Sequence, residues 1–198
     1  MAYGRSAKPN YGLDLANCYI ADLGAPALAD EDWVVVDVAM KVGTYLVAHA
    51  SPVDGLARNV TVIRTVGGNA DKPGTIIVAG TDVDGRAVSD TIAVGTTGVT
   101  VVGVVAFKTV TSVTGAGWVI NQAADTVKVG FGDKIGLPSA IRQSPPILAT
   151  TQIPFVVLGT TLVAATVTWD ANIIGKCTVD AATGTYNGSK RLLAFVVR

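Results

Sequence analysis

Charged residues are scarce in this chain of 198 residues: they make up 15%, against about a quarter in a typical soluble domain. Fifteen basic and fifteen acidic side chains cancel, so the basic excess that accompanies DNA or RNA binding is missing. Hydrophobic residues make up 49% and the mean hydropathy is +0.47, yet no apolar run approaches the roughly 18 residues that a membrane-spanning helix needs. We therefore expect no nucleic-acid and no membrane partner, and expect the surplus apolar surface to be buried against other protein chains.

Histidine and cysteine are nearly absent. His49 is the single histidine, which excludes a multi-histidine metal site and leaves one candidate base for a Ser-His-Asp arrangement. It precedes a turn and no nucleophile-elbow motif is present, so we interpret it as an ordinary histidine at a strand end. Cys18 and Cys177 are too far apart for a CxxC motif and too few for a disulfide framework. We interpret them as reduced thiols, with a bridge between them as the alternative.

The chain has β-branched runs separated by glycine-rich turns instead. The clearest case is Asp84-Gly85, which an apolar run (75–79) precedes and an alternating run (87–94) follows. Asp-Gly between such runs is a strong hairpin signal, because glycine supplies the positive φ of a tight turn. Residues 75–94 are therefore predicted to form two antiparallel strands around this turn.

The same pattern predicts an all-β fold. Short strands at this spacing, with glycine turns between them, favour an antiparallel β-sandwich, immunoglobulin-like or jelly-roll-like, over βαβ units. Besides the hairpin, the predicted strands cover residues 33–40, 44–50, 58–66, 99–105, 107–113, 119–120, 126–131, 155–158, 161–169, 176–180 and 192–197.

The pattern divides the chain into four parts. Residues 1–32 lack periodicity and are predicted to form an extended N-terminal arm, and residues 33–138 form the sandwich core. Residues 139–150 are a proline-rich connection, because the consecutive prolines Pro145 and Pro146 cannot donate to a ladder. Residues 151–198 either complete the sandwich or form a small second β subdomain, and the sequence leaves both open.

The arm holds the candidate partner-interface residues Tyr3, Arg5, Lys8 and Tyr11. Tyrosine and arginine are common anchors at protein interfaces, and a terminal segment of this kind is ordered only when a partner holds it. No apolar segment follows the two basic residues, so we expect no secretory signal.

No residue is predicted to be catalytic, cofactor-binding or metal-binding, and no cofactor is expected. The run Asp82-Val83-Asp84-Gly85 looks like the start of a calcium loop, but Ala93 stands where the loop needs a glutamate. A turn explains both aspartates, since short polar side chains cap their own backbone. Three tryptophans, Trp33, Trp118 and Trp169, could bind sugars if exposed; we expect them in the core.

Four segments carry a resemblance to a known family through their sheet-and-turn patterns: GTDVDGRAVSDTI (80–92), AFKTVTSV (106–113), DTVKVGFGDKIGLP (125–138), and TVD with GTY (178–180, 184–186). In these segments the chain resembles small structural proteins encoded in the virion-assembly regions of tailed bacteriophages. The resemblance covers about residues 58–190 and does not include the arm. It implies a virion component with a β-sandwich core, present in many copies and without enzymatic activity.

Our leading hypothesis is a capsid decoration or cement protein, located in the virion and assembled in the host cytoplasm. Its partners would be the major capsid protein and copies of itself, in a homo-oligomer or lattice. A tail or neck component is the first alternative, and a carbohydrate-binding or adhesin module is another. A β-sandwich hydrolase is the least favoured class, because the chain lacks a catalytic motif.

Overall fold

The computed structural model describes residues 18–67, 72–120, 124–136, 156–158, 161–163, 165–168, 178–181, 186–189 and 192–197. All regular secondary structure in these ranges consists of β-strands, which confirms the all-β prediction. The strands are β1 (Cys18–Asp22), β2 (Asp30–Ala39), β3 (Gly43–Tyr45), β4 (Arg58–Thr65), β5 (Gly74–Thr81), β6 (Ala87–Val94), β7 (Thr100–Phe107), β8 (Thr109–Ala116), β9 (Thr126–Gly136), β10 (Val156–Leu158), β11 (Thr161–Val163), β12 (Ala165–Thr168), β13 (Thr178–Ala181) and β14 (Leu192–Val197).

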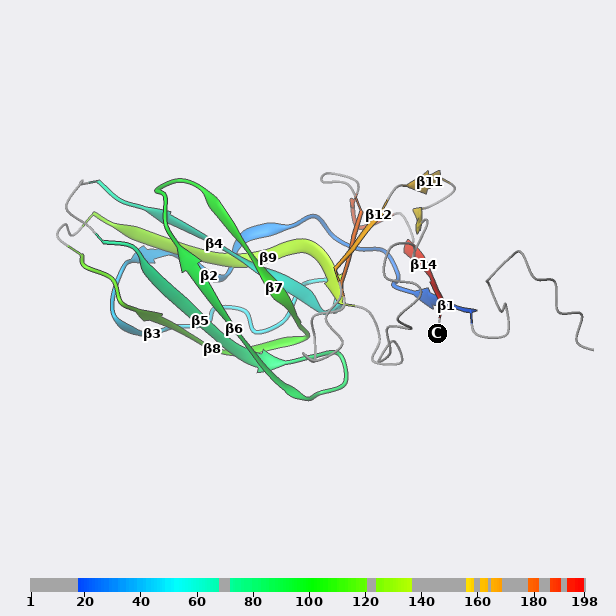
Figure 1. Ribbon diagram of the computed structural model, residues 1–198, viewed down its shortest axis with the longest axis horizontal. Helices are drawn as coiled ribbons and strands as arrows, with labels where there is room; N and C mark the ends of the chain where they lie inside the picture. Colours follow the sequence, from blue (N-terminus) through cyan, green and yellow to red (C-terminus); the bar gives the residue numbers. More distant parts are fainter. Residues whose placement is uncertain are drawn as a thin grey trace, which may run out of the picture.

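The strands form three antiparallel sheets. The β4 sheet has the order β12-β13-β9-β4-β7, and β2 also pairs with β9. The β5 sheet has the order β3-β8-β5-β6, and the β14 sheet has the order β1-β14-β10-β11. The β4 and β5 sheets lie in two layers, which makes the predicted β-sandwich (Figure 1).

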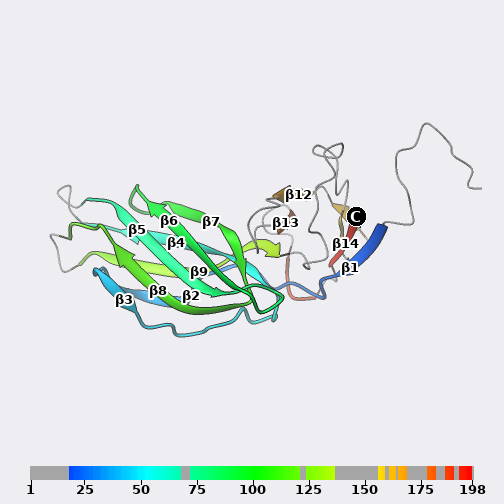
Figure 2. The same cartoon turned by 60° about the horizontal axis from the view of Figure 1, so that its bottom comes forward.

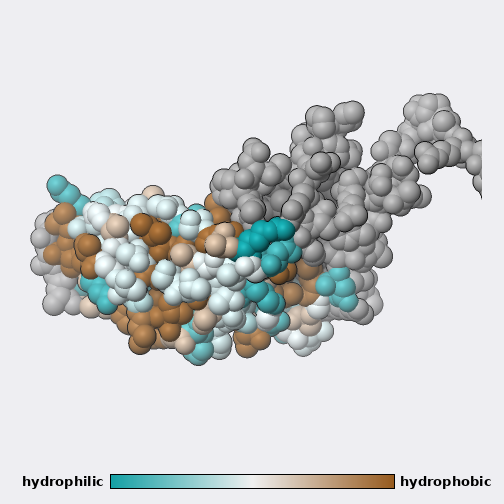
Figure 3. Space-filling view, turned by 90° about the horizontal axis from the view of Figure 1, so that it is seen from below, coloured by the Kyte–Doolittle hydropathy of each residue, from teal (hydrophilic) through white to brown (hydrophobic). Residues whose placement is uncertain are grey.

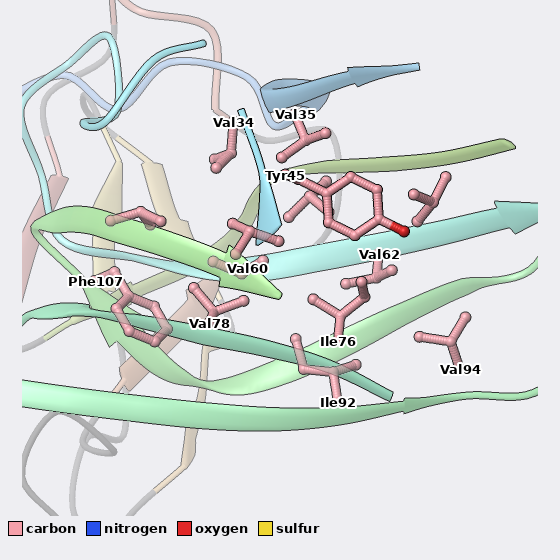
Figure 4. Close-up of a cluster of buried hydrophobic side chains, with 14 of the residues drawn as sticks. Val34, Val35, Tyr45, Val60, Val62, Ile76, Val78, Ile92, Val94 and Phe107 are labelled. Carbon is pink, nitrogen blue, oxygen red and sulfur yellow. The ribbon is translucent and has the colours of Figure 1, made fainter. Parts of the chain in front are cut away.

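The core lies between these two layers. On β4, Val60 and Val62 are fully buried, and they belong to the same face of the strand because side chains alternate along it. Opposite them, Ile76 and Val78 of β5 are also fully buried, and Figure 4 shows these side chains facing one another across the sandwich. The remaining buried members include residues of β2, β3, β6, β7, β8 and β9: Val34, Val35, Tyr45, Ile92, Val94, Val105, Phe107, Val110, Val113, Val127, Val129 and Phe131.

The Asp84-Gly85 hairpin is confirmed. β5 and β6 pair from Gly74↔Val94 to Thr81↔Ala87, and Gly85 has a φ of 77°. The buried Asp82 side chain caps the turn, because its Oδ1 accepts hydrogen bonds of 2.9 Å from the amides of both Asp84 and Arg86. The expected backbone-capping role of Asp82 is thereby confirmed.

The predicted strand over residues 44–50 is shorter in the structure, where β3 ends at Tyr45. The residues that follow connect the two sheets. Ala48 donates a 2.8 Å backbone hydrogen bond to Val34 of β2, and Ala50 accepts one of 2.7 Å from Val110 of β8. Because its partners belong to different sheets, this segment continues neither ladder.

The second half of the predicted arm contains regular structure. Residues 18–22 form β1, which pairs with β14 near the other end of the chain, and β2 begins at Asp30 rather than after residue 32. Local periodicity gave no sign of β1, and its partner lies between 171 (Asp22↔Leu193) and 179 (Cys18↔Val197) residues away in the sequence.

The C-terminal strands divide between two sheets. β13 pairs with the end of β9 through Thr178↔Gly136 and Val179↔Ile135, so β12 and β13 extend the β4 sheet. β10, β11 and β14 join β1 in the separate β14 sheet.

Asn59 lies opposite two irregularities in the β4 sheet. The register of β4 shifts between Asn59 and Thr61 against β7, and between Arg58 and Val60 against β9. The fully buried Asn59 amide serves both neighbours, donating to the carbonyl of Gly103 (3.3 Å) and accepting from the amide of Lys134 (2.9 Å). One side chain therefore satisfies backbone groups that the shifted ladders leave unpaired.

Candidate interaction surfaces

The sequence-predicted interface residues Tyr3, Arg5, Lys8 and Tyr11 lie outside the described residues, as do Trp169 and Cys177. The role of the arm therefore stays a prediction. The surfaces discussed below are made by described residues of the sandwich.

The outer side of the β5 sheet carries no charged side chain. Asp90 is the only charged residue in its four strands, and it belongs to the inward-facing series of β6 with Ile92 and Val94. We call the outward-facing residues of this sheet the neutral face; all are threonine, serine, alanine or isoleucine: Thr44, Thr75, Ile77, Ala79, Thr81, Ala87, Ser89, Thr91, Ala93, Thr109, Thr111, Ser112, Thr114 and Ala116.

Ile77 lies in the middle of the neutral face and is its one large apolar side chain. Strand pairing places Thr44, Thr114, Ile77 and Thr91 in one row across the four strands, and Figure 2 shows these strands side by side. Ile77 is 37% exposed. In Figure 3, which views the molecule from below, much of the sandwich surface is pale and strongly hydrophilic residues are confined to a few places.

The outer side of the β4 sheet differs, because it is partly covered and carries charge. Lys128 on β9 forms a 3.1 Å ion pair with Glu31, and Glu31 also accepts a 3.2 Å hydrogen bond from the Thr100 hydroxyl on β7. The chain passes so closely over β9 that a Cβ on Gly130 would clash with the carbonyl oxygen of Asp30. The two sides of the sandwich therefore offer different surfaces to a partner.

A second surface, the Leu46 strip, consists of Val36, Val38, Val42 and Leu46. These side chains are 51%, 37%, 65% and 86% exposed. The chain reverses direction after β2, and the Ala48 amide donates a backbone hydrogen bond to Val34, so the segment that carries Leu46 returns alongside β2. Figure 3 shows brown, hydrophobic areas along the lower left margin of the sandwich. Apolar side chains gathered on a surface in this way are typical of protein contacts.

Trp33 and His49 stack at the sandwich surface. Their ring centroids are 4.0 Å apart with an interplanar angle of 19°. The Trp33 indole donates a 2.9 Å hydrogen bond to the carbonyl of Ser51, and His49 Nδ1 lies 3.0 Å from the carbonyl oxygen of Trp33. A shallow pocket lined in part by Trp33, Leu28 and Val53 has room for about one water molecule. Trp118 is buried as predicted, whereas Trp33 is only partly buried.

A buried arginine, Arg58, joins several segments at one end of the sandwich. Its guanidinium pairs with Asp54 at 2.6 Å and donates to the carbonyls of Gly132 (2.9 Å) and Ala27 (2.7 Å). The buried Tyr186 ring lies 5.8 Å from the guanidinium carbon. One side chain thus connects β9 at its register shift against β4, the segment between β1 and β2, and the segment before β14.

The two carboxyl groups near Arg58 have pKa values shifted in opposite directions. Burial by itself would raise the pKa of Asp54, but hydrogen bonds from Arg58 and from the amides of Ala27 and Leu56 outweigh it, so this pKa is lowered. Burial raises the pKa of Asp133, and the Arg58 charge and the Ala29 amide offset that only in part. Asp54, rather than Asp133, is therefore the carboxylate whose ionised form Arg58 stabilises most.

Within the described ranges, no group of three or more histidine, cysteine, aspartate or glutamate side chains is arranged to hold a metal ion. The same part of the chain contains no helix with the length and apolarity to cross a bilayer.

Sequence reasoning missed both the neutral face and Arg58. The neutral face had a visible signal, because the strands GTIIVAGT, AVSDTIAV and TVTSVTGA contain a single charge between them. Arg58 had none, since nothing local distinguishes a buried arginine at the start of a strand from an exposed one.

In comparisons with known proteins, no family model, no curated protein and no solved structure matches this chain.

Proposed function

We propose that this chain is a non-enzymatic structural subunit of a tailed-phage particle, a decoration or cement protein bound to the outside of the head. The observation that carries the proposal is the Leu46 strip, because Leu46 is 86% exposed and three valines on β2 and the β2–β3 connection are exposed as well. Such a surface is costly to leave in water and favours a permanent protein contact. The resemblance to virion structural proteins supplies the kind of particle.

In this proposal the major capsid protein covers the Leu46 strip. DNA packaged inside a head pushes the capsid subunits apart, and a protein bound across their junction adds contact energy against that strain. Each copy needs to contribute only a few kcal/mol, about the amount that burying one or two aliphatic side chains provides. The regular lattice then multiplies that contribution.

A carbohydrate-binding module remains the second candidate, and the Trp33–His49 pair is the observation that favours it. Two stacked rings at a surface can support a sugar ring. Binding of a sugar would change the fluorescence of Trp33, whereas the buried Trp118 would respond little. A tail or neck location is distinguished from the head by copy number, since a head protein is present in hundreds of copies.

The test compares particles that lack the protein with particles to which the wild type, Leu46→Asp or Val53→Asp has been added back. Val53 is also highly exposed, at 70%, but lies in a turn outside the strip. We expect the wild type and Val53→Asp to delay DNA release on heating, and Leu46→Asp to bind poorly and delay it little. Binding should persist at moderate salt, because it depends on apolar contact.

Equal heat resistance with and without the wild-type protein would contradict the cement proposal. Labelling confined to the tail would support the tail alternative instead.

A further inference from the structure

We infer that the neutral face is a contact between two copies of this chain, related by a two-fold axis that passes near Ile77. The inference rests on the proposed function, because a structural subunit of a particle lattice meets copies of itself. It uses other residues than the Leu46 strip, so the capsid contact and the contact between copies can be tested by separate substitutions.

The absence of charge on the neutral face favours a second copy as the occupant. A two-fold axis brings each residue near it close to the same residue of the partner. A lysine or glutamate there would meet a like charge, which costs free energy. Threonine and serine hydroxyls both donate and accept hydrogen bonds, so they are complementary to themselves. The only charge in these strands, Asp90, points away from this face.

The shape of the neutral face also suits contact with another sheet. Its side chains are small apart from Ile77, and two sheets pack face to face about 10 Å apart with their strands rotated by about 30°. Ile77 lies in the central row, with Thr114 beside it on β8 and Thr91 on β6. The two copies of Ile77 would therefore meet at the axis as the apolar centre of the contact.

The size of the face indicates a weak contact. β5, β6 and β8 have 8 residues each, so the face is about 26 Å long and, with β3, between about 14 and 19 Å wide. Two such faces cover about 700–1,000 Å², below the range of most stable dimers. We therefore expect a dimer that forms at high protein concentration and becomes permanent where other contacts in a particle add to it.

Sedimentation of the purified full chain over a range of concentrations tests this contact. The wild type should be monomeric when dilute and dimeric when concentrated. Ile77→Asp places two like charges at the axis and should raise the dissociation constant at least about tenfold. Val102→Asp is the matched control, because Val102 is an exposed valine on the outer side of the β4 sheet. It should leave the dimer unchanged, and circular dichroism should show that both variants fold.

Cysteine cross-linking gives a second readout. In a chain with Cys18→Ser and Cys177→Ser, two copies of the Ile77→Cys variant should be joined by a short bis-maleimide cross-linker. Sheets about 10 Å apart hold the two thiols too far apart for a direct disulfide but within reach of such a reagent. The same chain with Val102→Cys should stay monomeric. Failure of Ile77→Cys to cross-link more than Val102→Cys would overturn the inference.

The outcomes separate this inference from the proposed function. If the wild type stays monomeric at every concentration and Ile77→Asp still blocks incorporation into particles, the face meets a different protein, so the second-copy contact is wrong and the structural function stands. If the dimer forms as expected but the protein is absent from particles, the contact is right and the proposed function fails.

Discussion

Asp90 on β6 accepts a 2.8 Å hydrogen bond from the backbone amide of Val104 on β7, across the gap between the two sheets. The same oxygen, Oδ2, accepts a 3.2 Å hydrogen bond from Val105. Both amides belong to residues between Val102 and Ala106, where the register of β7 against β4 shifts, so these residues have no regular pairing partner on β4. A Cβ on Gly103 would lie 2.8 Å from Asp90 Oδ2, which shows how closely the two edge strands approach. One carboxylate therefore closes the sandwich along this edge.

Replacing Asp90 with alanine should destabilise the domain by about 2 kcal/mol, because two amides lose a charged acceptor. Urea denaturation followed by circular dichroism measures the change. Ser89→Ala is the control, since Ser89 points outward on the same strand and should change the free energy of unfolding little. Equal stability of Asp90→Ala and the wild type would mean that water replaces the carboxylate at no cost.

Replacing Gly85 with valine should destabilise the domain by about 1 kcal/mol or more. Gly85 has a φ of 77°, and a β-branched residue fits that region poorly. Gly95→Val is the matched control, because a Cβ there meets no atom within 4 Å and Gly95 is not among the glycines with positive φ. A melting temperature lowered equally by both variants would show that the turn conformation is not the cause.

Asp54→Asn should lower stability at pH 7, by about 3 kcal/mol, because it leaves the buried Arg58 guanidinium without its charged partner. The pKa of Asp54 is lowered in the folded protein, so its contribution is fully present above the unfolded value of 3.8 and is lost as pH falls through the folded value. The difference between wild type and variant should therefore shrink below pH 3.8. A difference that stays constant across this range, in denaturation at a series of pH values, would contradict the assignment.

Asp133→Asn should change the free energy of unfolding at pH 7 in the opposite direction from Asp54→Asn. The pKa of Asp133 is raised by burial, so its ionised form costs stability, and that cost builds up as pH rises from the unfolded value of 3.8 through the folded value. The variant should be at least as stable as the wild type at pH 7, and its advantage should disappear in acid. A loss of stability at pH 7 would mean that the contacts of the carboxylate outweigh its burial.

Truncation separates the two halves of the predicted arm. Removing residues 2–17 should leave the described fold intact by circular dichroism but weaken incorporation into particles, because it removes Tyr3, Arg5, Lys8 and Tyr11. Removing residues 2–28 should also lower the melting temperature, since it deletes β1 and the Ala27 carbonyl that Arg58 binds. Normal incorporation of the shorter truncation would contradict the predicted role of the arm.

The strands and the main turn could be predicted from the sequence because their causes are local. Alternation along residues 58–65 placed Val60 and Val62 on one face, and Asp84-Gly85 set the turn between β5 and β6. The absence of charge on the neutral face also follows from the sequence, since it needs only strand bounds and the alternation of side chains.

The tertiary structure alone decided which strands pair and which polar groups are buried. Thr61 and Ile63 face outward in the alternation yet are only 7% and 8% exposed. β1 finds its partner at the far end of the chain, and Arg58 becomes buried because segments distant in sequence meet around it. Local periodicity sets the direction in which a side chain points, but the chain that covers it comes from elsewhere. Burial, pairing and the partners of buried charges therefore depend on long-range contacts that no single segment encodes.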